Sequence, residues 1–341
     1  MTRRRLQELL ERFSQLHITV AGDLFLDRWY EIDTGLNEPS VETGLTAYQI
    51  VKKRAAAGAA GTVLNNLSEM GVGVLEVVSL VGDDGDGWEM LRLLRKRGVD
   101  VSSVIISDEV VTPSYIKFRF PEEGNRFDIK NFLPTPAHLE DALIQRIEEA
   151  LLRSDALLLL DQVCEVDTGV LTAKVRDAVC DMARKYPDKL IFADSRAFID
   201  RFSNVVIKCN NFEAARMTGR EEDEESFDPA RVFACMADLQ KKTGRPVIIT
   251  CNKYGVAVEQ AGEKQVVPAA KQPGPIDICG AGDACSAGLA TALCAGGSYA
   301  EAAFVGNLSA VVTVREIGRT GMASREKMLA LYDEQWGERD V

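Results

Sequence analysis

Apolar positions along the chain follow two patterns, one typical of amphipathic helices and one of buried strands. After residue 136, stretches with helical spacing alternate regularly with short, uninterrupted apolar runs. The predicted helices lie near 137–153, 168–185, 211–218 and 229–243, and the predicted strands span 156–160, 190–193, 205–207 and 247–249. Uninterrupted apolar strands that alternate with helices indicate a parallel sheet covered on both faces. The pattern therefore predicts an α/β fold.

The first third of the chain extends this pattern and adds a different element. It predicts helices over 2–16, 58–71 and 86–97, and strands over 17–22, 74–81 and 101–106. Residues 28–54 alternate only weakly in a polar background, and the alternating stretches 114–120 and 126–129 flank Pro121 and Gly124 as in a hairpin. We expect segments 28–54 and 112–130 to form a small β lid, inserted in a single domain of residues 1–341.

Polar residues follow the predicted strands at the points where the strands end. These residues are Asp23, Asp161, Asp194, Asn210 and Thr250. In open parallel sheets ligands bind beyond the carboxyl ends of the strands, so this edge is the expected site. Strand ends are also exposed to solvent and acquire polar residues without any function, which is the alternative for each position.

Composition and charge limit the classes of function. The 40 Lys and Arg against 52 Asp and Glu give 40 − 52 = −12, which disfavours binding to nucleic acid or to an anionic membrane. No signal peptide and no apolar run long enough to span a bilayer is found. The eight cysteines are scattered and there are only two histidines, which argues against a disulfide framework and a His-rich zinc site. We expect a cytoplasmic protein without nucleic-acid or membrane partners.

The stretch from Asp277 to Ala290 is the strongest candidate for chemistry. Gly280, Ala281 and Gly282 form a turn that opens directly into a helix of small residues. The N–H groups at a helix N-terminus have no intrahelical partner and attract anions, so this turn is a plausible phosphate cradle. Asp283 follows in the first helical turn, where a carboxylate could accept a hydroxyl proton during phosphoryl transfer. The alternative is a tightly packed helix start with an acid that complements the dipole.

This Asp-x-x-Gly-Ala-Gly-Asp stretch resembles the signature of the ribokinase (PfkB) family of carbohydrate kinases. The resemblance covers about residues 17–334 and implies a ribokinase-like three-layer α/β/α fold with a mainly parallel central sheet and a small β lid. It implies that Asp283 is the catalytic base and that the amides of Gly280, Ala281 and Gly282 form the anion hole. It also implies ATP and Mg²⁺ as cofactors, with backbone carbonyls near Asp277 as a candidate site for K⁺.

The segment Gly22 to Trp29 is similar to the start of the D-glycero-β-D-manno-heptose-7-phosphate kinase branch of this family. The resemblance implies that Asp23 binds sugar hydroxyls and that Asp27 assists it, since a carboxylate can accept hydrogen bonds from two hydroxyls. A surface acid after a strand is the alternative.

Residues 58–71 resemble the family's Gly-Gly-x-x-Asn segment, which implies that Gly58 and Asn66 approach the sugar. The chain departs from the family here, because Ala59 stands for the second glycine and Thr62 for the expected asparagine. These departures put the identity of the sugar in doubt more than the class of reaction. A helix start used only for packing is the alternative.

Lys117 and Arg126 lie on the predicted lid hairpin and could hold a substrate phosphate. Arginine suits bidentate phosphate recognition, and lysine acts as a point charge. Exposed basic residues on strands usually have no such role, which is the alternative for both.

Asn210 and Glu213 match the family's Asn-x-x-Glu, which the resemblance associates with Mg²⁺, its waters and the phosphates. Three residues apart at a helix start, they would lie near one face. A capping box, in which the two residues satisfy each other's backbone N–H groups, is the alternative and is compatible with the metal role.

Thr250, Asn252 and Gly255 resemble the family's Thr-x-Gly-x-x-Gly nucleotide segment, with Asn252 in place of the middle glycine. Asparagine tolerates the left-handed conformation better than other non-glycine residues. Asn307 matches a family position beside the adenine pocket, and a helix-surface or buried capping role is its alternative.

Taken together, the sequence predicts an ATP-dependent kinase for a hydroxyl of a sugar or sugar phosphate, with a heptose 7-phosphate as a candidate. Neither a P-loop nor a complete dinucleotide fingerprint is present. The alternatives are a kinase of the same family for a free sugar, a nucleoside or a fructose phosphate, and a non-catalytic ligand-binding regulatory protein. The edges of the lid sheet could pair in a homodimer.

Overall fold

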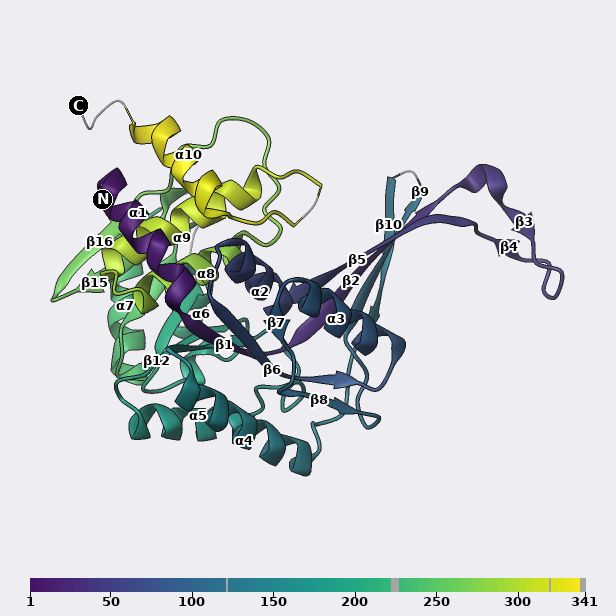
Figure 1. Ribbon diagram of the computed structural model, residues 1–341, viewed down its shortest axis with the longest axis horizontal. Coiled ribbons are helices and arrows are strands. Elements are labelled where there is room, and N and C mark those ends of the chain that lie inside the picture. Colours follow the sequence, from purple (N-terminus) through teal and green to yellow (C-terminus); the bar gives the residue numbers. More distant parts are fainter. Residues whose placement is uncertain (121, 222–226, 319, 338–341) are drawn as a thin grey trace.

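The computed structural model describes residues 1–120, 122–221, 227–318 and 320–337 (Figure 1). A large sheet runs through the body in the order β16-β15-β14-β13-β12-β11-β1-β6-β7, and β8 also pairs with β6. Its strands are β1 (His17–Gly22), β6 (Val74–Gly82), β7 (Val99–Asp100), β8 (Val104–Ser107), β11 (Ala156–Asp161), β12 (Leu190–Ser195), β13 (Val206–Asn210), β14 (Val247–Thr250), β15 (Val256–Gln260) and β16 (Glu263–Val267). The pairs from β7 through β14 are parallel, and β14, β15 and β16 pair antiparallel. The predicted mainly parallel sheet is confirmed.

Helices pack on both faces of this sheet. One face carries α1 (Arg3–Arg12), α2 (Ala60–Glu69), α3 (Gly85–Lys96), α8 (Ala281–Cys294), α9 (Tyr299–Val314) and α10 (Arg325–Trp336). The other carries α4 (Ala137–Arg153), α5 (Ala173–Lys185), α6 (Asn211–Met217) and α7 (Pro229–Thr243). Successive residues of β11 show why its sequence is apolar throughout, because Leu158 and Leu160 join the first core and Leu157 and Leu159 the second. This is the three-layer α/β/α arrangement.

A second sheet projects from the body (Figure 1). It has the order β10-β9-β2-β5 and consists of β2 (Leu24–Ile32), β5 (Ile50–Ala59), β9 (Ser114–Phe120) and β10 (Glu122–Ile129). The connection from β2 to β5 extends outward as an arm that contains β3 (Glu38–Pro39) and β4 (Thr46–Ala47). The predicted hairpin is confirmed, because β9 and β10 pair antiparallel. This sheet fits the expected lid. However, β2 begins at Leu24 and β5 ends at Ala59, so both strands extend beyond the predicted segment 28–54 toward the body.

Candidate functional site

The polar residues at the strand ends come together at one edge of the main sheet. Strands β1, β11, β12, β13 and β14 are consecutive neighbours and run in parallel. Asn210 and Thr250 face each other in the register of the last pair. The predicted row of acids and amides is therefore confirmed as a spatial feature.

Helix α8 begins at this edge with an open N-terminus. Gly280 caps it in the left-handed conformation, with φ 78°, and a Cβ there would lie 2.7 Å from Thr320 Cγ2. The N–H of Ala281 donates to the carbonyl of Ile278, and the helical ladder starts with the N–H of Ala284 donating to Gly280. The N–H groups of Gly282 and Asp283 lie between these two bonds. They are the amides best placed to receive an anion.

Asp283 is half-buried in the first turn of α8. Burial and the nearby Asp194 raise the pKa of its carboxyl to about 7, against the opposing effect of Lys208. A carboxyl that titrates near neutral pH can both hold and release a proton under working conditions, as a general base must. Asp283 therefore has the chemistry that the sequence motif predicts, while its role in catalysis stays a prediction.

A buried ion pair lies behind this turn. Lys208 of β13 donates to Oδ2 of Asp194 on β12 over 2.9 Å, and the hydroxyl of Ser286 in α8 donates to the same oxygen over 2.6 Å. Burial alone would lower the pKa of Lys208, but the Asp194 carboxylate holds this pKa above its ordinary value. The lysine is therefore a fixed positive charge beside the helix N-terminus.

The lid brings Asp27 toward the same region. Burial raises the pKa of the Asp27 carboxyl, and Lys117 and Arg126 oppose this effect. The Asp27 carboxylate lies where a side chain at position 58 would stand, so Gly58 provides the space for this carboxylate. Asp27 also contributes to the raised pKa of Asp283, which places the two acids in one electrostatic site.

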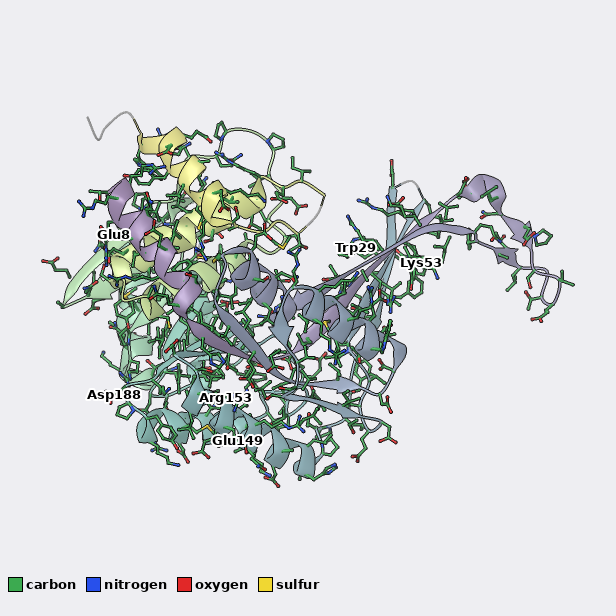
Figure 2. All side chains as sticks on the ribbon, viewed as in Figure 1. Glu8, Trp29, Lys53, Glu149, Arg153 and Asp188 are labelled. Carbon is green, nitrogen blue, oxygen red and sulfur yellow. The ribbon has the colours of Figure 1, made fainter. Side chains whose placement is uncertain are left out.

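A row of cations crosses the lid one step farther out. In the strand register Arg54 faces Trp29, Trp29 faces Lys117, and Lys117 faces Arg126. The Arg54 guanidinium lies 4.4 Å and the Lys117 ammonium 5.5 Å from the centre of the Trp29 ring. Arg126 forms a bidentate pair with Asp128. Trp29 lies on the projecting sheet (Figure 2). The sequence analysis identified Lys117 and Arg126 but missed Arg54, because the row is visible only in the register.

Asp23 is buried and bound to the backbone. Its carboxylate accepts the N–H groups of Gln162, Val163 and Val170. Burial raises its pKa to about 6, although these bonds lower it in part. Its contact with the sugar stays a prediction, because these three hydrogen bonds favour an anchoring role for Asp23.

Asn66 is also buried within the fold. Its amide donates to the carbonyl of Thr62 over 3.0 Å and accepts the N–H of Ala323 over 3.1 Å. These bonds favour a structural role in α2. Asn66 as a sugar ligand remains a prediction without geometric support.

Asn210 and Glu213 form a capping box at the start of α6. The Asn210 side chain accepts the N–H of Glu213, and Oε2 of Glu213 accepts the N–H of Asn210, each over 2.8 Å. The second carboxylate oxygen of Glu213 has no hydrogen-bond partner within the part of the chain that the structure describes, so it is left for another ligand. Mg²⁺ prefers oxygen ligands and keeps several waters, so one carboxylate and a neighbouring amide fit its needs. Among the described residues no group of three or more His, Cys, Asp or Glu side chains could hold a metal alone.

The nucleotide segment has the backbone that its residue types predict. Asn252 is left-handed at φ 49°, and Gly255 at φ 110° lies so close to the Val267 carbonyl that a side chain would not fit. Asn307 donates to the carbonyls of Val267 and Pro268, which ties α9 to the end of β16. The residues expected around the adenine are therefore linked to one another.

Asp277 fixes the loop before the Gly-Ala-Gly turn. Its carboxylate accepts the N–H groups of Cys279 and Gly318 over 3.0 and 3.1 Å. These bonds hold the local backbone, and a cation site formed by the carbonyls of this loop stays a prediction.

A small cavity lies between the lid and the sheet edge. Its lining includes Phe25, Tyr115, Lys130, Gln162 and Arg196. The positive charge of Arg196 lowers the pKa of Asp283, so this cavity and the turn before Asp283 share an electrostatic environment. Lys130 and Arg196 escaped the sequence analysis because single basic residues carry no motif.

The chain matches the pfkB family of carbohydrate kinases over residues 31–325. It is 26% identical over 330 residues to the bifunctional protein HldE of Sulfurimonas denitrificans, covering 94% of this chain and 65% of that protein. It is 28% identical over 337 residues to HldE of Paramagnetospirillum magneticum, covering 96% and 66%. The chain thus spans slightly less than two thirds of the length of these relatives.

Solved structures agree with this result. The ribokinase of Thermotoga maritima superimposes with a TM-score of 0.67 at 18% identity, over 93% of this chain and 99% of that chain. The Arabidopsis thaliana ribokinase complexed with ribose and ATP gives 0.66 at 17% identity, over 93% and 98%. These likenesses confirm the ribokinase-like fold. Within the described part of the chain, none of the helices has the length and hydrophobicity of a membrane span. The chain belongs to the pfkB family of carbohydrate kinases.

Proposed function

We propose that the protein phosphorylates a hydroxyl of a sugar phosphate, with Asp283 as the catalytic base. The observation that carries this proposal is the position of Asp283 beside the open N–H groups of α8, with a pKa raised to about 7. The base and the anion site thus lie within one helical turn. Asp27 completes the acceptor side from the lid.

In the proposed reaction the acceptor hydroxyl attacks the γ-phosphorus of ATP as the bond from that phosphorus to the β–γ bridging oxygen breaks. Asp283 accepts the hydroxyl proton, and ADP leaves with the bridging electrons. The N–H groups of Gly282 and Asp283 stabilise the charge on the transferred phosphoryl oxygens. The Asp27 carboxylate binds neighbouring hydroxyls and thereby orients the acceptor.

Asn210 and Glu213 would hold Mg²⁺ and its waters at the strand edge, where the ion would neutralise phosphate charge. The segment from Thr250 to Gly255, together with Asn307, would border the nucleotide. We place K⁺ near Asp277, and a comparison of rates in K⁺ and Na⁺ buffers tests that assignment.

The cation row favours an acceptor that already carries a phosphate. Strand residues two positions apart are about 6.5 Å apart along the strand. The row of Arg54, Lys117 and Arg126 is one such step beyond Asp27. A sugar held by Asp27 would therefore reach these cations with an anionic group at its far end. Together with the resemblance of residues 22–29, this supports a heptose 7-phosphate as the acceptor.

We also infer a homodimer formed through the lid. On the face opposite the cation row, the Phe118 ring contacts the Tyr30 and Phe127 rings at 5.5 and 5.3 Å, and Phe127 is 59% exposed. A second copy covering this apolar face would remove it from water. Analytical ultracentrifugation, which measures the mass of the particle in solution, tests the homodimer.

We expect the enzyme to work in the cytoplasm, where ATP is available and the free cysteines stay reduced.

The deciding experiment measures ADP release from Mg·ATP with a panel of acceptors. The panel contains heptose, hexose and pentose phosphates, the free sugars and nucleosides, with Asp283→Asn as the control. We expect the highest kcat/KM with a sugar phosphate and loss of the signal in the variant. Turnover restricted to free sugars or nucleosides would contradict the acceptor class, and ATP binding without turnover would favour a regulatory protein.

A further inference from the structure

The ion pair between Lys208 and Asp194 is buried directly behind the phosphate cradle. The two residues are partners in the register of β12 and β13, and they are only 6% and 7% exposed. Ser286, three residues after Asp283 in α8, donates to the same Asp194 oxygen that Lys208 contacts. Residues three apart lie on one face of a helix, so this face of α8 is tied to the pair.

The ammonium of Lys208 lies close to the cradle itself. A Cβ built on Gly282 would be 3.8 Å from Lys208 Nζ. The lysine ammonium thus lies within van der Waals reach of position 282, whose N–H group belongs to the cradle. The lysine charge and the helix N-terminus therefore act on the same small space.

Stability alone gives little reason to retain such a pair. Two buried charges lose their hydration, and replacement by apolar residues of similar volume is often neutral or stabilising. The pair also places two opposite charges beside the carboxyl of Asp283, whose ionisation matters for the proposed reaction. Its position relative to Asp283 therefore decides what it can do.

The charged groups that face Asp283 come from four places in the fold. Asp194 on β12 and Asp27 on β2 raise the pKa of Asp283, whereas Lys208 on β13 and Arg196 after β12 lower it. The two members of the buried pair thus act on the base with opposite signs. Because burial is the largest cause of the raised pKa, the site needs a nearby positive charge to keep the carboxylate ionised at neutral pH.

We propose that Lys208 is a positioning residue of the phosphoryl-transfer site, which Asp194 and Ser286 hold behind Gly282 so that its charge keeps Asp283 ionised for the incoming hydroxyl. Asp194 has two effects in this arrangement. It fixes the lysine, and its own charge limits how acidic Asp283 becomes. The inference rests on the proposed role of Asp283 as the base.

The test compares the pH dependence of kcat/KM in Lys208→Met, Asp194→Asn, the double variant and Lys208→Arg. The reaction uses Mg·ATP with heptose 7-phosphate, or with the panel sugar that the wild type converts fastest. The acid limb of the profile reports the ionisation of the base in the free enzyme. A neighbouring charge shifts such a pKa by about one unit.

We expect the acid limb to move by about one unit to higher pH in Lys208→Met and to lower pH in Asp194→Asn. The double variant should return near the wild-type position, and Lys208→Arg should keep it. A purely structural pair would lower activity in both single variants without moving the limb in opposite directions. That result, or shifts of equal sign, would overturn the proposal.

Folding of the variants is checked by circular dichroism, because each single change leaves one charge buried without its partner. If Lys208→Met does not fold, Asp194→Asn decides, and an unmoved limb or one moved to higher pH overturns the proposal. A wild-type protein without turnover on any acceptor overturns the proposed function as well. Normal turnover with limbs that do not move overturns the Lys208 inference alone.

Discussion

Replacement of Asp283 by asparagine should have two opposite effects, one on catalysis and one on stability. Asparagine keeps the size of the side chain but cannot accept the hydroxyl proton. A positioned base contributes about 10²–10⁴ to the rate, so kcat should fall by that factor while ATP still binds. Stability should instead increase at alkaline pH, because the variant no longer buries a carboxylate.

The size of the stability effect follows from the raised pKa. Asp283 has a pKa of about 7 in the folded protein against an ordinary value of 3.8. From about pH 4 to pH 7 the folded state keeps a proton that the unfolded state has released, so the wild type loses stability as the pH rises. The full shift corresponds to an upper limit of about 4 kcal/mol. Between pH 6 and pH 8.5 the ionisation of Asp283 should lower the free energy of unfolding of the wild type by about 1.4 kcal/mol.

The assay is urea unfolding of wild type and Asp283→Asn at pH 6 and at pH 8.5. A protein is least soluble at its isoelectric point, which is near 4.9 for this chain, and both pH values lie above it. Asp23 and Asp161, with pKa values raised to about 6 and about 7, titrate in both proteins and cancel in the difference. The stability advantage of the variant should grow by about 1.4 kcal/mol toward pH 8.5. An advantage that is equal at both pH values, or near-wild-type turnover, would refute the reasoning.

Three further predictions test other parts of the site. Gly280→Ala should lower kcat at least about tenfold through strain and a clash at the cradle, whereas Gly98→Ala, with a similar φ of 75° and open space around it, should leave kcat unchanged. Lys117→Gln should raise KM for a sugar phosphate about tenfold without changing KM for ATP, and Lys53→Gln on the opposite lid face should change neither (Figure 2). Glu213→Gln keeps the capping box but should raise the Mg²⁺ concentration needed for half-maximal rate; an unchanged requirement argues against its metal role.

The main sheet could be predicted because its strands are buried on both faces. The run from 156 to 160 has no polar residue, and each of its side chains enters one of the two cores. The boundaries were less accurate where tertiary contacts decide them. The predicted helix 168–185 begins only at Ala173, because Thr172 caps it and Val170 donates to Asp23.

The lid and one strand were harder to recognise from the sequence. Both faces of the outer lid are partly exposed, so β2 and β5 lack the apolar alternation that marks a half-buried strand. The predicted strand 101–106 is a strand only from Val104 onward, in β8, because residues 101–103 form a turn after β7 in which the N–H of Val104 donates to the carbonyl of Val101. The two polar residues Ser102 and Ser103 mark this turn, which the predicted strand runs across.

In the site, too, features set by neighbouring residues could be predicted, and features set by contacts between distant residues could not. The turn before Asp283 and the left-handed Asn252 follow from residue types that are adjacent in the sequence. Ala59 has φ 53°, a conformation that favours the glycine other family members are expected to have there. Arg54 and Lys208 became candidates only through strand register and burial, which a single sequence does not contain.

The most direct test of the central claim is a crystal structure with Mg²⁺, a non-hydrolysable ATP analogue and a sugar phosphate. We predict that the γ-phosphoryl group receives hydrogen bonds from the N–H groups of Gly282 and Asp283. The Asp283 carboxylate should lie within about 3 Å of the acceptor hydroxyl. The sugar's phosphate should contact the cation row that includes Lys117. A nucleotide bound elsewhere, or an acceptor hydroxyl directed away from Asp283, would contradict the account.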